Sequence, residues 1–144
     1  GRLREAPLKA LFDDYAGRST WPIQVKEVEE KRKLAPAERM ESEARLLAAS
    51  LPDKATLIVL DQRGKVLSSE AFAAQLGRLR DEGLQDLGFV IGGADGLTAD
   101  WRRKARLVLS FGAMTWPHLL ARVMLAEQLY RAQSILAGHP YHRA

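Results

Sequence analysis

The sequence contains no cysteine. This absence excludes disulfide bonds, zinc sites with thiolate ligands, iron–sulfur clusters and cysteine nucleophiles. The sequence also lacks a run of about 18 apolar residues, which a membrane-spanning helix would need, and its first residues do not resemble a secretory signal peptide. From these absences we expect a cytoplasmic protein with no membrane partner.

Several common catalytic and binding motifs are missing as well. No Gly-x-Gly-x-x-Gly pattern, Walker lysine or Gly-x-Ser-x-Gly elbow occurs, which argues against a nucleotide phosphate site and a serine hydrolase. His139 and His142 lie three residues apart, but no acid or cysteine near them completes a ligand set. We therefore predict no metal site.

The chain has an ordinary globular composition. Its 144 residues are 47% apolar and 28% charged. A chain of this size and composition can form a hydrophobic core without disulfides or structural metal ions. No internal repeat or Pro/Gly-rich linker divides it. We therefore expect a single domain over residues 1–144.

Positive charge is concentrated near the end of the chain. The net charge is +4, yet residues 101–144 contain seven basic residues, one acid (Glu127) and all three histidines. This asymmetry has two interpretations. It can serve an anionic partner such as RNA, or the basic run 102–106 can simply be a solvated helix face.

The apolar pattern alternates between helix and strand periods. Helices are predicted at 7–16, 36–50, 68–83, 99–105 and 117–137, the last one ended by Gly138 as a C′ glycine. Strands are predicted at 23–28, 55–61, 87–91 and 106–110, and the second is expected to end in a turn at 62–64. Helices that alternate with strands favour an α/β fold with a mostly parallel sheet flanked by helices.

Three loops are expected beyond the carboxyl ends of these strands, where α/β sheets bind ligands. They follow Leu60, span 92–96 and span 111–116. The second is glycine-rich, so backbone can approach a ligand closely there. On its own, this loop fits a tight structural turn equally well.

The helix 117–137 is apolar around most of its circumference. Such a helix must be buried on two sides, which in a small domain favours a two-fold homodimer. The alternative is a helix buried inside a monomer. His118, at the start of this helix, and Tyr141, in the tail, each also fit a purely packing or capping role.

Four segments give the chain a specific resemblance. They are Phe89–Gly96 (FVIGGADG), Met114–His118 (MTWPH), Leu125–Ala132 (LAEQLYRA) and Gly138–Arg143 (GHPYHR). Together they resemble the bacterial ribosomal RNA large subunit methyltransferase H family, SPOUT enzymes that methylate N3 of a pseudouridine in 23S ribosomal RNA. The likeness covers nearly the whole chain. Members begin with a short strand before a glycine that matches Gly1, so we expect that strand to precede residue 1.

The resemblance implies a SPOUT α/β fold with a C-terminal trefoil knot and S-adenosylmethionine as cofactor. By motif, the cofactor-binding residues are Leu60, Gly92, Phe111, Gly112, Ala113, Met114, Thr115 and Trp116. The expected catalytic residues are Arg131, Tyr141 and His142, and the expected substrate-binding residues are His118, His139 and Arg143.

The expected partner is 23S ribosomal RNA in the assembled ribosome. Arg131 and Arg143 would stabilise the anion of the target base, while Tyr141 or His142 would position the base or accept its proton. A non-catalytic RNA- or ribosome-binding module with the same fold is the alternative. The tail from His139 to Arg143 disfavours a SPOUT enzyme that acts on transfer RNA.

Overall fold

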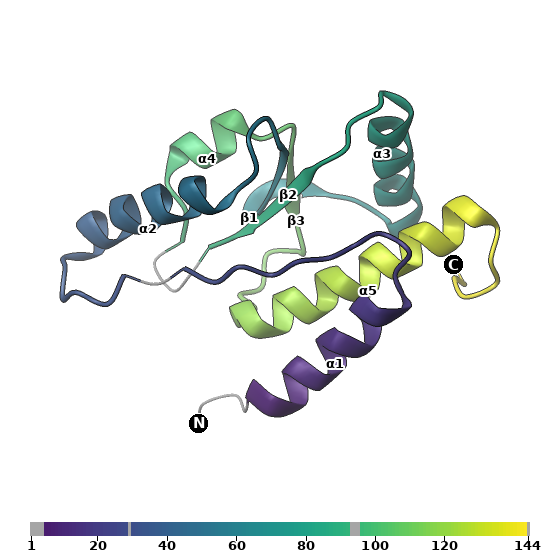
Figure 1. Ribbon diagram of the computed structural model, residues 1–144, viewed down its shortest axis with the longest axis horizontal. Helices are drawn as coiled ribbons and strands as arrows, with labels where there is room; N and C mark the ends of the chain where they lie inside the picture. Colours follow the sequence, from purple (N-terminus) through teal and green to yellow (C-terminus); the bar gives the residue numbers. More distant parts are fainter. Residues whose placement is uncertain (1–4, 29, 93–95, 144) are drawn as a thin grey trace. The chain divides into compact units, whose positions relative to one another are not determined.

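The computed structural model describes residues 5–28, 30–92 and 96–143. Helices and strands alternate along most of this chain (Figure 1). In order, the elements are α1 (Glu5–Arg18), α2 (Pro36–Ser50), β1 (Thr56–Val66), α3 (Ser69–Asp81), β2 (Leu87–Ile91), α4 (Ala99–Lys104), β3 (Leu107–Ser110) and α5 (His118–Ala137). Among the described residues, no helix has the combination of length and apolarity that a membrane span requires.

The elements group into two compact units. The sheet unit comprises residues 25–66 and 84–114, with all three strands, α2 and α4. The helical unit comprises residues 1–24, 67–83 and 115–144, with α1, α3 and α5.

The strands form a parallel sheet in the order β2-β1-β3. Leu60 of β1 is in register with Ile91 of β2 and with Leu109 of β3. The predicted α/β class with a parallel sheet is therefore confirmed. Because all the strands run the same way, their carboxyl ends share one edge of the sheet.

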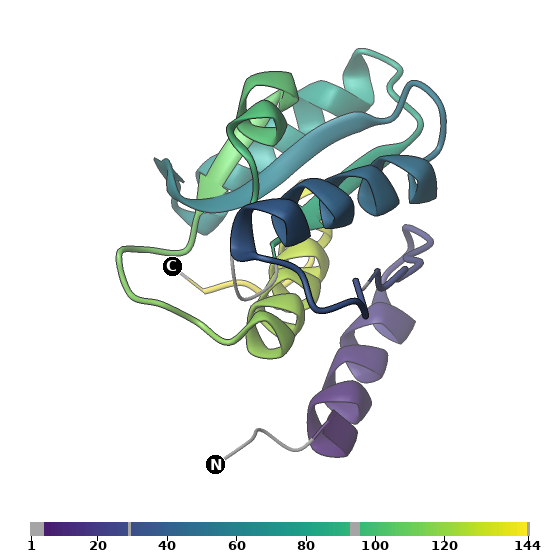
Figure 2. The ribbon, with the colours of Figure 1, turned by 90° about the vertical axis from the view of Figure 1, so that its left-hand side faces the viewer.

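Helices α2 and α4 pack on the sheet through one apolar cluster (Figure 2). Val59, Val90 and Trp101 form its buried centre, one from each of β1, β2 and α4. Leu47 and Leu51, from α2 and the residue after it, pack against this centre. Burying a Trp and two Val side chains here removes from water the apolar area that holds the two helices on the sheet.

In the helical unit, α5 packs against both α1 and α3. Gly77 of α3 allows close approach, because a Cβ there would lie 3.0 Å from a methyl group of Leu136. The end of α1 is tied to α5 by Gln133, whose Oε1 accepts from the backbone N–H of Thr20 at 2.7 Å. Two sides of the apolar α5 are thus covered within one chain.

The helix boundaries follow local signals. Ser68 caps α3, since its Oγ accepts from the backbone N–H of Ala71 at 3.0 Å, and Pro36 occupies the first turn of α2, where a missing N–H costs nothing. Gly138 ends α5 with a left-handed φ of 72°, which glycine adopts without strain. All five predicted helices are confirmed, within two residues at every end.

The predicted strand 23–28 is wrong. Residues 22–28 have no regular secondary structure, and within the described chain the sheet consists of β1, β2 and β3 alone. Val25 is 45% exposed. Alternation of apolar and polar residues matches the period of a strand, but a strand forms only where a neighbouring strand accepts its backbone hydrogen bonds.

The predicted turn at 62–64 is also wrong, because β1 continues through it to Val66. The pairing of β1 with β3 shifts from Leu60↔Leu109 to Lys65↔Leu109. The residues between Leu60 and Lys65 form a bulge-like irregularity in β1. Gly64 permits this, since a Cβ there would lie 2.5 Å from the carbonyl oxygen of Val108.

Candidate functional site

The carboxyl edge of the sheet brings together three of the predicted cofactor-binding positions. Leu60 is paired with the last residue of β2 and with a residue near the end of β3. Gly92 directly follows β2, and Phe111 directly follows β3. Residues separated by up to about 50 positions in the sequence thus meet at one edge, as the parallel arrangement requires.

Gly92 lies where its own loop folds back on it. A Cβ at this position would lie 2.9 Å from Leu97 Cγ and 3.0 Å from the carbonyl carbon of Gly96. Any larger residue would therefore displace backbone. The predicted glycine turn 92–96 is described only at Gly92 and Gly96, since residues 93–95 lie outside the described residues.

The loop after β3 is braced at its start. Gly112 has a φ of +105°, a conformation that favours glycine, and its N–H donates to Ser110 Oγ at 3.0 Å. Further along, Gln62 Nε2 donates to the carbonyl oxygen of Met114 at 3.3 Å. Sequence reasoning missed both Ser110 and Gln62 as supports. A serine that ends a strand two residues before a glycine was the available signal.

The predicted cofactor residues of this loop are partly open to solvent. Ala113 and Thr115 are exposed, Met114 is 72% exposed and Trp116 is 39% exposed. Large apolar side chains at an exposed loop mark a surface that can receive a ligand or a partner. The loop therefore offers both apolar side chains and backbone groups to a small molecule.

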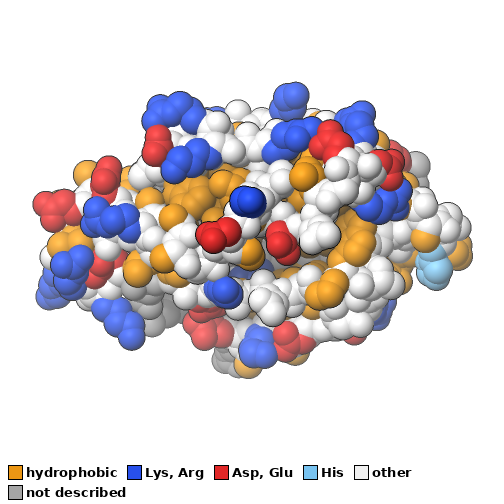
Figure 3. Space-filling model, turned by 45° about the horizontal axis from the view of Figure 1, so that its top comes forward, with side chains coloured by type: hydrophobic (Ala, Val, Ile, Leu, Met, Phe, Trp, Pro, Cys, Tyr) orange, Lys and Arg blue, Asp and Glu red, His pale blue; other side chains and the backbone are white. Residues whose placement is uncertain are grey.

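The basic run of α4 is paired with acids. Arg102 lies 3.3 Å from Asp61, and Lys104 lies 3.8 Å from Asp100, which also pairs with Arg103. On the face shown in Figure 3, Lys and Arg side chains are interspersed with Asp and Glu. This pairing favours a solvated face for the run rather than a dedicated polyanion site.

A second set of predicted residues meets in the helical unit. Arg131, on α5, donates from Nε and Nη2 to Oε1 of Glu127 at 2.9 and 2.5 Å. The hydroxyl of Tyr141 donates to the same oxygen at 3.0 Å. The guanidinium of Arg131 also lies 4.9 Å from the centroid of the Tyr141 ring. The ring of Tyr130 packs edge-on against the Tyr141 ring, with 4.6 Å between the two centroids. The tail is thereby folded back along α5.

His142 joins this cluster to α3. Its Nδ1 lies 3.0 Å from Arg131 Nη1, and its Nε2 lies 2.8 Å from Oε1 of Glu70. Arginine is only a donor, so Nδ1 must accept and Nε2 must carry the hydrogen that Glu70 accepts. The contacts therefore assign one neutral tautomer to His142. We call Glu70, Glu127, Arg131, Tyr141 and His142 the tail cluster.

The tail cluster keeps its groups in defined protonation states. Burial, with hydrogen bonds to Tyr15 and Glu127, raises the pKa of Tyr141 to about 12. The hydrogen bond to Glu127 raises the pKa of Arg131, and the hydrogen bond from His142 lowers the pKa of Glu70. Near neutral pH, Tyr141 is thus a donor and Arg131 a cation.

The phenol of Tyr141 should ionise late, near pH 12. Below pH 10 its phenol is protonated in both folded and unfolded chains, whereas between pH 10 and about 12 only the unfolded chain ionises fully. Its contribution to folding stability is therefore constant below pH 10 and declines as the pH rises towards 12. Absorbance titration at 295 nm should show one late transition that Tyr141→Phe removes. A late transition that survives this substitution would contradict its assignment to Tyr141.

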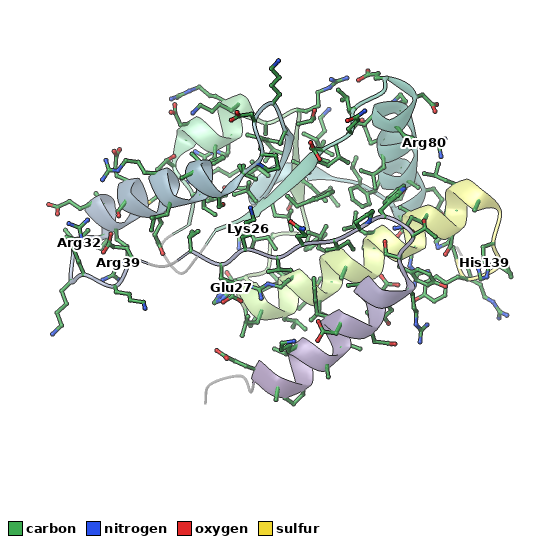
Figure 4. All side chains as sticks on the ribbon, viewed as in Figure 1. Lys26, Glu27, Arg32, Arg39, Arg80 and His139 are labelled. Carbon is green, nitrogen blue, oxygen red and sulfur yellow. The ribbon has the colours of Figure 1, made fainter. Side chains whose placement is uncertain are left out.

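The remaining predicted residues lie outside this hydrogen-bonded network. His139 follows α5 near the end of the chain (Figure 4), where its Nδ1 accepts from the backbone N–H of Tyr141 at 3.3 Å. Arg143 and His118 are exposed, and His118 is the first residue of α5. Within the described ranges, no three His, Asp or Glu side chains are grouped to hold a metal ion.

Sequence reasoning missed two acids of the tail cluster, Glu127 and Glu70. Glu127 had a signal, because it is the only acid among residues 101–144 and stands four positions before Arg131, a spacing that pairs charges on a helix. Glu70 had none, since it lies 72 positions from His142. The side chains of Glu70 and His142 meet only because α3 packs on α5.

Comparison with known proteins identifies relatives over the full length. A family model described as "Predicted SPOUT methyltransferase" matches residues 1–142. A protein of Rhodospirillum centenum named ribosomal RNA large subunit methyltransferase H is 57% identical, over all of this chain and 95% of its own length. A protein of Rhodopseudomonas palustris with the same name is 52% identical over the same shares.

A solved structure gives a weaker match. The SpoU methyltransferase AviRb from Streptomyces viridochromogenes, crystallised with AdoMet, is 21% identical. The match covers 71% of this chain and 37% of that one, with a TM-score of 0.40. A likeness this slight has no bearing on the fold or the ligand.

Proposed function

The chain belongs to the SPOUT methyltransferase family, and on this premise we propose that it transfers a methyl group from S-adenosylmethionine to N3 of a pseudouridine in 23S ribosomal RNA. The observation that carries the proposal is the 57% identity, over the whole chain, to a protein named ribosomal RNA large subunit methyltransferase H. The hydrogen-bonded tail cluster supports it, because this cluster contains all three side chains that the family resemblance assigns to catalysis.

We propose that the carboxyl edge of the sheet binds the cofactor. Leu60, Gly92 and the loop 111–116 would hold S-adenosylmethionine chiefly through backbone groups, and the close backbone approach at Gly92 fits such a site. The exposed Met114 and Trp116 supply apolar area for an adenine ring. When bound, S-adenosylmethionine supplies a methyl group activated by its sulfonium charge.

The tail cluster suits the base. The ring nitrogen must lose its proton, and the guanidinium of Arg131, with Arg143 beside the cluster in sequence, would stabilise the resulting anion. Tyr141 donates its hydroxyl hydrogen to Glu127 and both ring nitrogens of His142 are engaged. We propose that these two side chains position the base, and that its proton leaves to water.

RNA contacts would extend from the tail cluster to the exposed His118, His139 and Arg143. Cations at such positions attract a polyanion with an affinity that falls as salt rises. The substrate would be the assembled ribosome, in the cytoplasm. The family resemblance further supports one SPOUT domain over the chain, with a C-terminal trefoil knot.

We expect the protein to form a homodimer through α5 and α1. Although α1 and α3 pack on α5, α1 buries none of its own described residues fully, and Leu11 is 43% exposed. A two-fold contact would cover this apolar surplus and let the tail of one protomer complete the site of the other. Light scattering at micromolar concentration should give twice the 16.0 kDa chain mass. A monomer would contradict this arrangement.

The methyl transfer itself is tested with radiolabelled cofactor. Ribosomes that carry the unmethylated pseudouridine should accept one methyl group each, whereas ribosomes with uridine at that position should accept none. Isothermal titration should show S-adenosylmethionine binding in the absence of RNA. Binding of ribosomes without cofactor binding or methyl transfer would identify a non-catalytic module instead.

A further inference from the structure

Glu70 is hydrogen-bonded to His142, one of the residues proposed to position the base. It stands in the first turn of α3, two residues after the capping Ser68. Its side chain is half exposed, yet its Oε1 accepts from His142, whose side chain is only 16% exposed. A hydrogen bond from a mostly buried ring to an ionised carboxylate is stronger and more directional than a surface ion pair.

The other groups around His142 do not duplicate this contact. Arg131 donates to Nδ1, and Tyr141 and Glu127 hold Arg131 rather than the imidazole. Without Glu70, no other hydrogen bond among the described residues would orient the Nε2–H side of the ring. The imidazole ring would then rotate about its single remaining hydrogen bond, the one from Arg131.

We propose that Glu70 is a positioning residue of the methyl-transfer site: by accepting the Nε2–H of His142, it fixes the orientation of that ring. This inference rests on the proposed function. Glu70 itself lies on α3 and acts through His142, so we assign it no direct contact with the RNA base.

Three substitutions separate the contact from a general effect of charge. Glu70→Gln keeps the length and the accepting oxygen without the charge. Glu70→Asp keeps an acid in the first turn of α3, where the helix dipole favours it, but is too short by one methylene to reach Nε2. Glu70→Ala removes both the negative charge and the accepting oxygen.

We expect Glu70→Ala and Glu70→Asp to lower kcat about five- to tenfold. The KM for S-adenosylmethionine should be unchanged, because Glu70 contacts His142, which is assigned to the base and not to the cofactor. Glu70→Gln should stay within about twofold of the parent. An exposed acid of another helix, changed in Glu41→Ala, should have no effect. Parent-like kcat in Glu70→Ala or in Glu70→Asp would overturn the proposal.

A readout independent of methyl transfer follows the hydrogen bond directly. The imidazole N–H of His142 should give a slowly exchanging proton resonance in the parent and in Glu70→Gln, assigned by its loss in His142→Asn. It should disappear in Glu70→Ala and Glu70→Asp. If the parent fails to methylate the ribosome, the proposed function is wrong, and persistence of this resonance in Glu70→Ala would separately refute the contact.

Discussion

A chain that ends at Gly138 should methylate the ribosome roughly a thousandfold more slowly than the parent while it stays folded and binds S-adenosylmethionine with little change. The deletion removes Tyr141, His142 and Arg143 together. Loss of a single preorganised donor costs about 10²–10³ in rate, and the orientation of the base is lost as well. The deleted residues include no strand or helix, so the core should remain intact.

Rate, cofactor affinity and mass must be measured on the same preparation. Circular dichroism and light scattering check the fold and the oligomeric state, and titration checks the cofactor site. Arg78→Ala removes an exposed cation from α3 outside the tail cluster and should leave the rate unchanged. If the shortened chain methylates at the parental rate, the tail cluster is structural and its catalytic assignment is wrong.

Gly92→Val should lower the affinity for S-adenosylmethionine about five- to a hundredfold. A side chain at this position meets Leu97 and the backbone of Gly96 at 2.9–3.0 Å, so the loop must shift. Forcing atoms into a packed site costs about 1–3 kcal/mol, and each 1.4 kcal/mol corresponds to about tenfold in affinity. Isothermal titration measures the effect directly.

The control for this substitution is Gly17→Ala, because a Cβ at Gly17 meets nothing within 4 Å. It should bind the cofactor as the parent does. Gly92→Ala should lie between the two, since the methyl group alone already makes the close contacts. Parental affinity in a folded Gly92→Val protein would remove this loop from the cofactor site.

Local signals were sufficient to predict most of the regular structure. Pro36, Ser68 and Gly138 mark helix ends because each one satisfies or spares backbone groups at that place. The β-branched run of β1 predicts a buried strand because such side chains pack well on a pleated sheet. These effects depend on neighbours a few residues away, so they can be predicted from the sequence.

The same reasoning failed where the outcome depended on distant backbone. Ile23–Val28 alternates like a strand but finds no partner edge in the described sheet. Residues 62–64 resemble a turn, but the shifted pairing of β1 with β3 extends the strand through them. A strand requires hydrogen bonds from another segment, and period alone does not supply that segment.

The sequence by itself determined the helices, the parallel α/β class, and, through four motif segments that include the tail, the family and the residues to examine. The tertiary structure alone decided which of those residues contact one another. It paired Arg131 with Glu127 and Tyr141, and it placed Glu70 against His142 across 72 positions of sequence. Hydrogen bonds fix tautomers and orientations only over about 3 Å, a distance that exists only once α3 has packed on α5.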